Sequence, residues 1–522
     1  MRDGIPHETT KPISPMVECA IFHCHHMKTI THSVLAAILS LFSVSVLAQT
    51  SATVSTLAGQ ALSSGSSDGI GSAARFYYLT AITADNAGNL YVADTNNHTI
   101  RKIVASTGAV TTLAGLAGSY GSVDGTGSAA RFNSPSGVAV DYLGNVYVAD
   151  TLNHTLRKVT WQGVVSTLAG STGTAGSVDG VGSAARFNRL QGLAIDGGNN
   201  LYVADTNNHT IRKVALSTGV VTTVAGLAGS SGSVDGSGSV ARFSFPSGVA
   251  VDSAGTLYVA DTENHTIRTI PPSGLVSTLA GLATSSGSAD GTGSAARFDS
   301  PTDVAVDLSG NVYVADTDNF TIRKIVSSTG AVSTVAGLAG TSGSTDGSGS
   351  AVRFFGPTGI AVYPDTTLYV ADTNNHTVRV GLMPMIPAIL MQPTSKLVYA
   401  GYSFSLSVTA SGYPAVTYQW YFNGTAISGA TSSMYSGIAK SSDAGQYTVV
   451  VSNTLGSVTS NEATLSIDTT PPPSFWSGMG GSMGMGGGAP SEWFYGVLLA
   501  IAAVRLFQSR TKAAGPADHS SI

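Results

Sequence analysis

Short apolar segments alternate with glycine- and asparagine-rich turns along most of the chain. The stretch between Pro135 and Gly170 shows the pattern once. Apolar or alternating runs occupy residues 137–141, 145–149, 154–159 and 164–169, and turn residues lie at 143–145, 152–153 and 161–163. Runs of this length, bounded by turn residues, predict β-strands joined as hairpins. Each such stretch is therefore expected to form a four-stranded antiparallel sheet.

The phrase Tyr-Val-Ala-Asp-Thr occurs six times, with its tyrosine at positions 91, 147, 202, 258, 313 and 369. The successive spacings are 56, 55, 56, 55 and 56 residues, and this alternation indicates that a two-blade unit was duplicated. A sheet-forming unit repeated at such a period predicts a radial array of small sheets. We therefore predict an all-β chain whose main domain, residues 50–381, is a six-bladed β-propeller.

The way the repeats begin and end predicts how the ring closes. Segments of the type Val-Ser-Thr-Leu-Ala-Gly start at residues 54, 110, 165, 221, 276 and 332. One of them precedes the first Tyr-Val-Ala-Asp phrase and none follows the last, so the sixth blade lacks its outer strand. Residues 53–58 are expected to supply that strand, because an unpaired sheet edge invites aggregation.

Residues 89–103 read Asn-Leu-Tyr-Val-Ala-Asp-Thr-Asn-Asn-His-Thr-Ile-Arg-Lys-Ile, which resembles the NHL repeat. The resemblance extends over residues 53–381. Known NHL domains are β-propellers, so the resemblance implies the fold that the strand pattern predicts. One position departs from the pattern: Phe320 stands where the other five copies have histidine, at 98, 154, 209, 265 and 376.

A different pattern follows a proline-spaced linker at 382–387. Residues 388–467 hold short alternating strands with Tyr-Gln-Trp-Tyr at 418–421 and Asp-Ala-Gly-Gln-Tyr at 443–447, and they resemble a bacterial immunoglobulin-like domain. The resemblance implies a β-sandwich with Trp420 as its core tryptophan and Tyr447 as its tyrosine corner. Val408 and Val449 stand where the usual two cysteines would be, so apolar packing is expected to replace the disulfide.

The N-terminal segment predicts export. Residues 27–48 contain Met27, Lys28, an apolar stretch and a final Val-Leu-Ala, which together are typical of a secretory signal peptide. Residues 1–26 are then an extension from an upstream start or a disordered leader. The two cysteines, Cys19 and Cys24, lie there beside three histidines. A zinc site is the alternative interpretation, but a segment that precedes an export signal would be removed with it.

The C-terminal segment also bears on the localisation of the protein. Residues 468–488 form a Pro/Gly/Met-rich spacer, 489–512 combine a short motif, an apolar run and basic residues, and 513–522 form a disordered tail. Residues 489–512 resemble the sorting tail of exosortase-like systems. The apolar run is shorter than the ~20 residues of a membrane span. We expect transient membrane association during export, with the mature protein secreted or attached to the bacterial cell surface.

Two repeated constellations could carry chemistry. The connection between blades contains Asp124, Arg131 and Phe132, and its Asp-Gly-x-Gly core resembles part of a calcium loop. One aspartate is too few for calcium, so we interpret Asp124 as a turn residue or a partner of Arg131, and Phe132 as packing between blades. Asp94 and His98 could form a metal or acid–base pair, but the repetition of this pattern around a ring favours hydrogen bonding within the hairpin.

A ligand or catalytic site in such a propeller is expected at the mouth of its central channel, which the first strand of each blade lines. The first strands begin with the pairs 80–81, 136–137, 191–192, 247–248, 302–303 and 358–359, which contain a single acid and no histidine. No cofactor, metal site or catalytic residue is predicted. The ligand-binding candidates are positions where the blades differ: Thr80, Gln191, Asp303, Phe320 and Tyr363.

Composition and charge narrow the range of functions that the sequence allows. Charged residues make up 11% of the chain, and the net charge is −5, which excludes the basic surface typical of nucleic-acid binding. We predict an exported, non-catalytic scaffold, monomeric in its propeller, that binds protein or glycan at the cell surface through a propeller face. The alternatives are a lyase- or lactonase-type enzyme with a metal site in the channel, and a structural surface-layer or matrix protein.

Overall fold

The computed structural model describes residues 51–363 and 367–470. The predicted N-terminal extension, signal peptide, sorting tail and final tail lie outside these residues, as does most of the predicted spacer. The described chain is all-β, and its helical segments are single turns of 3-10 helix. None of the helical segments in this part of the chain is long and apolar enough to cross a membrane.

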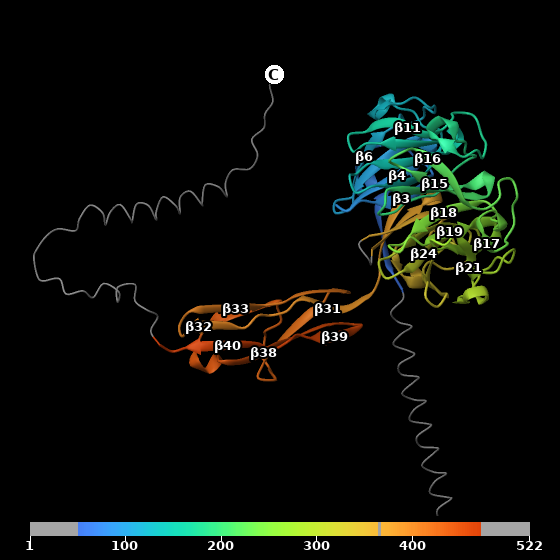
Figure 1. Ribbon diagram of the computed structural model, residues 1–522. Coiled ribbons are helices and arrows are strands. Elements are labelled where there is room, and N and C mark those ends of the chain that lie inside the picture. Colours follow the sequence, from blue (N-terminus) through green and yellow to red (C-terminus); the bar gives the residue numbers. More distant parts are fainter. Residues whose placement is uncertain (1–50, 364–366, 471–522) are drawn as a thin grey trace, which may run out of the picture. The chain divides into compact units, whose positions relative to one another are not determined.

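Six antiparallel sheets form the propeller, which confirms the six predicted blades (Figure 1). Blade 1 contains β2 (Gly69–Ile70), β3 (Leu79–Ala84), β4 (Asn89–Asp94), β5 (Thr99–Val104) and β6 (Ala109–Ala114). Blade 2 contains β7 (Gly125–Thr126), β8 (Pro135–Val140), β9 (Val146–Asp150), β10 (Thr155–Val159) and β11 (Val164–Gly170). Blade 3 contains β12 (Gly180–Val181), β13 (Leu193–Ile195), β14 (Asn200–Asp205), β15 (Thr210–Ala215) and β16 (Val220–Ala225).

The second half of the ring repeats this order. Blade 4 contains β17 (Gly236–Ser237), β18 (Pro246–Val251), β19 (Leu257–Asp261), β20 (Thr266–Ile270) and β21 (Leu275–Gly281). Blade 5 contains β22 (Gly291–Thr292), β23 (Pro301–Val306), β24 (Asn311–Asp316), β25 (Thr321–Val326) and β26 (Ala331–Ala336). Blade 6 contains β27 (Gly347–Ser348), β28 (Pro357–Val362), β29 (Thr367–Asp372), β30 (Thr377–Leu382) and β1 (Thr53–Gly59).

Each blade has one strand more than the four predicted. The additional strand is a two-residue piece of the connection between blades, and in blade 2 it places Gly125 opposite Val165 on the outer strand. A 3-10 turn follows it at once, so the connection folds back onto the outer edge of the blade. The six turns are η1 (Gly71–Ala73), η3 (Gly127–Ala129), η5 (Gly182–Ala184), η7 (Gly238–Val240), η9 (Gly293–Ala295) and η10 (Gly349–Ala351).

The N-terminal strand closes the ring, as the ends of the repeats predict. Strand β1 lies between β27 and β30 in the sixth sheet, with Thr53 opposite Leu382. Gly59 at its end has a φ of +92°, and a Cβ there would lie 2.4 Å from the carbonyl oxygen of His376. Only glycine fits such a position. The outer edge of the sixth blade is therefore paired.

The hydrophobic cores of the propeller lie between neighbouring blades. One of them joins Tyr91 and Ile100 of blade 1 to Val138 and Val148 of blade 2. Phe132, from the connection between the two blades, is fully buried among these residues. The connection thus contributes to packing, which explains why its sequence repeats as closely as that of the strands.

The inner strands β3, β8, β13, β18, β23 and β28 neighbour one another and surround a central channel. We name its two ends by the side chains that each blade places there. The hydroxyl end, where the inner strands begin, has Thr80, Ser136, Gln191, Ser247, Thr302 and Thr358. The carboxylate end, just beyond these strands, has Asp85, Asp141, Asp196, Asp252, Asp307 and, in blade 6, Tyr363.

The second module forms sheets of the immunoglobulin-like type. Its strands are β31 (Met385–Met391), β32 (Lys396–Tyr399), β33 (Ser403–Ser407), β34 (Thr409–Tyr413), β35 (Thr417–Phe422), β36 (Thr425–Ala426), β37 (Met434–Ile438), β38 (Gly445–Asn453), β39 (Gly456–Thr459) and β40 (Ala463–Asp468). The largest sheet has the order β32-β40-β38-β35-β36. Because β30 ends at Leu382 and β31 begins at Met385, the predicted linker at 382–387 is largely strand.

The core of this module contains the residues that the resemblance singled out. Trp420 is fully buried and donates from Nε1 to the carbonyl oxygen of Ser432 at 2.9 Å. Tyr447 is buried, and its ring lies 5.0 Å from that of Phe422. Val408 and Val449, at the places of the usual cysteines, are both buried. Apolar side chains therefore occupy the positions where a disulfide would otherwise lie.

Candidate ligand-binding channel

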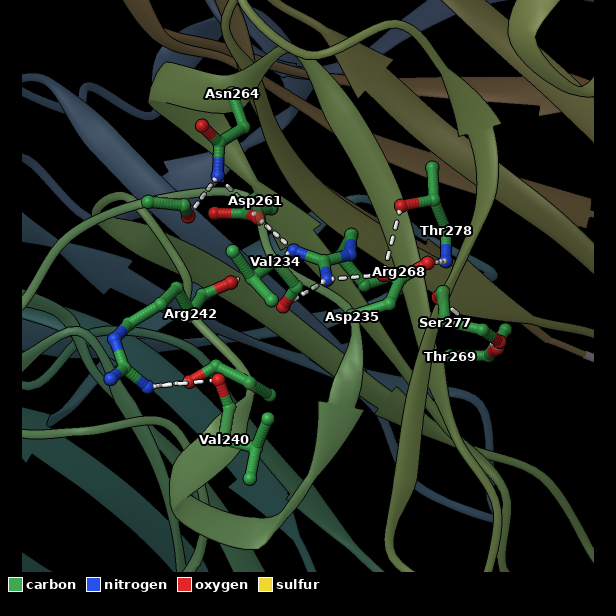
Figure 2. A network of polar contacts seen from close by, with 12 residues as sticks. Val234, Asp235, Val240, Arg242, Asp261, Asn264, Arg268, Thr269, Ser277 and Thr278 are labelled. Carbon is green, nitrogen blue, oxygen red and sulfur yellow. Dashed lines mark hydrogen bonds and ion pairs between the residues drawn. The ribbon is translucent and has the colours of Figure 1, made fainter.

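Every blade contains a buried arginine that joins two aspartates, shown for blade 4 in Figure 2. Arg268 pairs with Asp261 at 2.7 Å and with Asp235 at 2.5 Å. Arg268 and Asp261 are fully buried, whereas the side chain of Asp235 is 50% exposed. Asp235 also accepts hydrogen bonds from the backbone and hydroxyl of Thr278. The arginine therefore attaches the connection between blades to the blade itself.

The same network shows what Asp94 and Asp124 do. Asp94 accepts hydrogen bonds from the backbone N–H of Tyr77, the amide of Asn97 and the guanidinium of Arg101. Burial raises the pKa of Asp94 to about 6, although these donors and the charge of Arg101 lower it. Asp124 pairs with Arg157 at 2.6 Å.

The predicted pairing of Asp124 with Arg131 is therefore wrong. Arg131, which follows the turn η3, donates instead to the carbonyl oxygens of Ser128 and Ala130, at 2.6 and 2.8 Å. The arginine that does pair, Arg157, was not singled out from the sequence. Its signal was present: an arginine recurs seven residues after the aspartate of every Tyr-Val-Ala-Asp phrase, on a strand whose neighbouring positions are apolar.

The repeated histidines connect one blade to the next. His98 follows the 3-10 turn η2 (Thr95–Asn97), has a φ of 58°, and accepts at Nδ1 a hydrogen bond from the backbone N–H of Ser134 in blade 2. Burial lowers the pKa of His98. Equivalent bonds join His154, His209, His265 and His376 to the following blade.

In blade 5, Phe320 stands in place of the histidine and makes a ring contact instead of this hydrogen bond. Its ring lies 6.2 Å from that of Phe355 in blade 6, in an edge-to-face arrangement. The equivalent of Ser134 in that blade is Gly356. Phe320 does not line the channel, so the structure places it apart from the candidates at the channel mouth.

The channel is a cavity of about 410 Å³ whose wall is mostly apolar between its two ends. Three of the candidates, Thr80, Gln191 and Asp303, line it together. Thr80 donates to the carbonyl oxygen of Ser136 in the next blade at 3.1 Å, and Ser247, Thr302 and Thr358 make equivalent bonds. These hydroxyl groups therefore connect successive blades at the hydroxyl end.

Gln191 interrupts the ring of hydroxyl groups. It stands in blade 3 where the other blades have serine or threonine. Its backbone N–H donates to Ala204, but its side-chain amide makes no hydrogen bond within the described part of the chain. The amide can therefore both donate to and accept from a molecule in the channel.

Asp303 is the single acid among the residues that line the channel. Its carboxylate accepts hydrogen bonds from the backbone N–H groups of Val304, at 2.9 Å, and of Ile360 in blade 6, at 3.0 Å. Burial raises the pKa of Asp303 to about 7, although both donors lower it. Four other blades have glycine here, and a Cβ on Gly248 would lie 2.7 Å from Asp303 Oδ1.

The carboxylate end is built from turns. Asp141 accepts from the backbone N–H groups of Leu143 and Asn145, from the Asn145 amide and from the hydroxyl of Tyr147. Asp85, Asp196 and Asp307 make the same four kinds of bond. In blade 6 the hydroxyl of Tyr363 donates to the carbonyl oxygen of Asn86 at 2.6 Å. Tyr363 thus lies at the opposite end from Thr80 and Gln191.

The acids and histidines do not gather into a metal site in the described residues. No group of three or more histidine, cysteine, aspartate or glutamate side chains lies close enough there to hold an ion. In the Asp-Gly loops, the aspartate oxygens contact arginine and threonine instead.

Comparisons with known proteins agree with both folds. The NHL repeat family matches residues 76–103, 132–159, 187–214, 243–270, 298–325 and 354–380, and the immunoglobulin domain family matches residues 386–453. The chain thus carries six NHL repeats and one immunoglobulin-like domain.

Individual relatives match the propeller over part of their length. NHL repeat-containing protein 2 of Bos taurus is 32% identical over 335 residues, 57% of this chain and 46% of that protein, so the chain spans less than half of this relative. A Bacteroides thetaiotaomicron protein of unknown function has 22% identity and a TM-score of 0.50, over 64% of this chain and 76% of that chain. An auxiliary nutrient binding protein from Bacteroides ovatus has 17% identity and a TM-score of 0.48, over 64% and 77%.

Proposed function

We propose that this protein is an exported, non-catalytic binding protein of the bacterial cell surface or medium, which binds protein or glycan through a face of its propeller. The immunoglobulin-like domain serves as a spacer or a second contact. The propeller acts as a monomer, and nucleic acid is not among its ligands.

One observation carries the proposal: the repeated polar side chains are engaged in holding the ring together. In every blade the aspartate of Tyr-Val-Ala-Asp binds a buried arginine, and that arginine binds the aspartate of the connection. Five of the six histidine positions bond to the next blade. The side chains that differ between blades are left to recognise a ligand.

The candidates for that role are Thr80, Gln191 and Asp303 in the channel, Tyr363 at its carboxylate end, and Phe320, which lies outside the channel at the contact between blades 5 and 6. Gln191 has an amide without a hydrogen bond to the described chain, and Asp303 has a carboxylate without a cationic partner there. Groups of this kind, placed in a cavity that also has apolar side chains along its wall, are typical of ligand sites.

The test is a screen of the full chain against arrays of proteins and oligosaccharides, followed by hydrogen–deuterium exchange with and without the ligand that binds. We expect slower exchange in propeller peptides, including those at either end of the channel. Slower exchange confined to residues 388–467, or no retained ligand on either array, would contradict the proposal.

A further inference from the structure

Blade 2 departs from the other blades in both turns at the carboxylate end. The turn between β8 and β9 contains Tyr142 and Leu143, and the turn between β10 and β11 contains Trp161. Tyr142 is 72% exposed and Trp161 is 65% exposed, and Leu143 is exposed as well. Blade 4, whose turns have the same lengths, has Ser253, Ala254 and Pro272 at these three positions.

The two turns lie next to each other, and hydrogen bonds fix the backbone of each. Asp141 fixes the first turn by accepting from the backbone N–H groups of Leu143 and Asn145. In the second turn, Gly163 donates to the carbonyl oxygen of Thr160 at 2.8 Å. A Cβ on Gly144 would lie 3.6 Å from the Cβ of Trp161, so the turns are in van der Waals range. Exposed rings on such fixed hairpins cost little entropy to order on binding.

Tyr142 also forms part of the wall of a second cavity, of about 230 Å³, at this end of the channel. Its polar wall includes the carboxylates Asp85, Asp141 and Asp196 and the amides of Asn86 and Asn199. The carboxylates are fully used by the turns described above. The side chains of Asn86 and Asn199 are exposed, and neither makes a hydrogen bond within the described part of the chain.

We propose that this surface, formed by Tyr142, Trp161, Asn86 and Asn199 and here called the blade-2 site, binds a neutral oligosaccharide. The proposal rests on the proposed function and specifies its ligand class and its face. Asn86 and Asn199 hydrogen-bond the hydroxyl groups of one sugar in the cavity, and Tyr142 and Trp161 stack on the C–H faces of that sugar and its neighbours.

The chemistry of the surface favours sugar over other ligands. The C–H groups of a sugar ring carry partial positive charge and suit the negative face of an aromatic ring. Primary amides donate and accept at once, as sugar hydroxyl groups require. The cavity is smaller than the ~300–1,000 Å³ of sites for drug-sized ligands, which fits a single ring. The three aspartates in its wall disfavour phosphate and acidic sugars.

A protein partner fits the surface less well. A stable protein interface buries about 800 Å² on each partner and places a buried aromatic or aliphatic cluster at its centre. The blade-2 site offers two exposed aromatic side chains beside a polar cavity. We therefore commit to the neutral oligosaccharide and treat binding of a peptide as an outcome of the test.

The experiment uses the full chain, neutral and acidic oligosaccharides, and peptides, with affinities measured by calorimetry. The main variant combines Tyr142→Ser, Leu143→Ala and Trp161→Pro, which gives blade 2 the turn residues of blade 4 and therefore preserves folding. The control variant combines Ser253→Ala and Pro272→Ala in blade 4. We expect the neutral oligosaccharide to bind, the main variant to weaken it about a hundredfold, and the control to leave it within about twofold.

The outcomes separate the two proposals. Neutral-oligosaccharide binding that the main variant leaves unchanged overturns the blade-2 site but keeps a glycan-binding propeller. Peptide binding that depends on Trp161, or a preference for acidic sugars, overturns the ligand class while a propeller face still binds. A chain that binds no member of any of the three sets contradicts the proposed function and this inference together.

Discussion

At the scale of single residues, the two aspartates bound to each arginine differ in burial and should differ in energetic weight. Asp261→Ala removes the buried ion-pair partner of Arg268 while the arginine stays buried, so we expect a loss of about 3–5 kcal/mol in the free energy of unfolding. Asp235→Ala removes a half-exposed partner and should cost about 1 kcal/mol or less. Urea denaturation measures both, and equal losses would contradict this account.

Asp303 predicts a dependence of stability on pH. Burial raises the pKa of Asp303 to about 7, well above the ~3.9 of an unfolded aspartate. A raised pKa in the folded state gives stability at low pH that is lost as the pH rises through about 7. The side chain introduced by Asp303→Asn cannot ionise. The free energy of unfolding of this variant, relative to that of the natural protein, should therefore rise by on the order of 1–3 kcal/mol between about pH 5 and about pH 8. Denaturation at both pH values checks this, with Asp303→Gly, the residue of four other blades, as the control.

At the scale of elements, the histidines predict the opposite dependence. Burial lowers the pKa of His98, His154, His209 and His376. A lowered pKa gives stability that is present above the unfolded value of about 6.5 and is lost as the pH falls through the folded value. We expect thermal stability to fall between about pH 7 and about pH 5 more steeply than in a variant with these four changed to phenylalanine, the residue of blade 5. The buried aspartates are common to both proteins, so their contribution cancels in the difference.

The closing strand is the second prediction at this scale. Deletion of residues 50–60 removes β1 and exposes the edges of β27 and β30, so the melting temperature should fall sharply. Moving the segment 53–59 to follow Leu382 through a hairpin such as residues 105–108 should restore it, because every other blade is continuous in sequence. An unchanged melting temperature after the deletion would refute the closure.

The sequence predicts the elements better than it predicts their side-chain partners. Repetition reveals the six blades and the closing strand, because strand patterns and their order are properties of the chain itself. The pairing of Asp124 with Arg157 depends on how the connection folds back onto its blade, which no local pattern contains. The fifth strand of each blade escapes prediction for the same reason, since two residues have no periodicity.

At the scale of the whole molecule, near-identical blades make each departure from the repeat informative. The comparison of blades led to Gln191 and Asp303, which the channel does bring together. It did not lead to Tyr142 and Trp161, because they lie in turns, where variation is ordinary. Only the structure shows that the two turns are adjacent and that the turn with Tyr142 borders a cavity.

Binding and folding should be separable between the modules. We expect a chain of residues 51–382 to fold and to bind the same ligand as the full protein, because the closing strand and all six blades lie within it. Calorimetry on this fragment and on the full chain measures the two affinities. A fragment that is folded by circular dichroism but does not bind would assign the ligand to the immunoglobulin-like domain.

The pairing of Thr53 with Leu382 also sets the earliest time at which the ring can close during synthesis. Among the strands of the propeller, β1 is synthesised first and its partner β30 last. At about 5–20 residues per second, synthesis of the segment between them takes roughly 15–70 s. Until then the sixth blade is incomplete, and the N-terminal strand lacks the partner that it pairs with along its length. The newborn chain therefore stays open through that interval, available to any machinery that handles unfolded polypeptides.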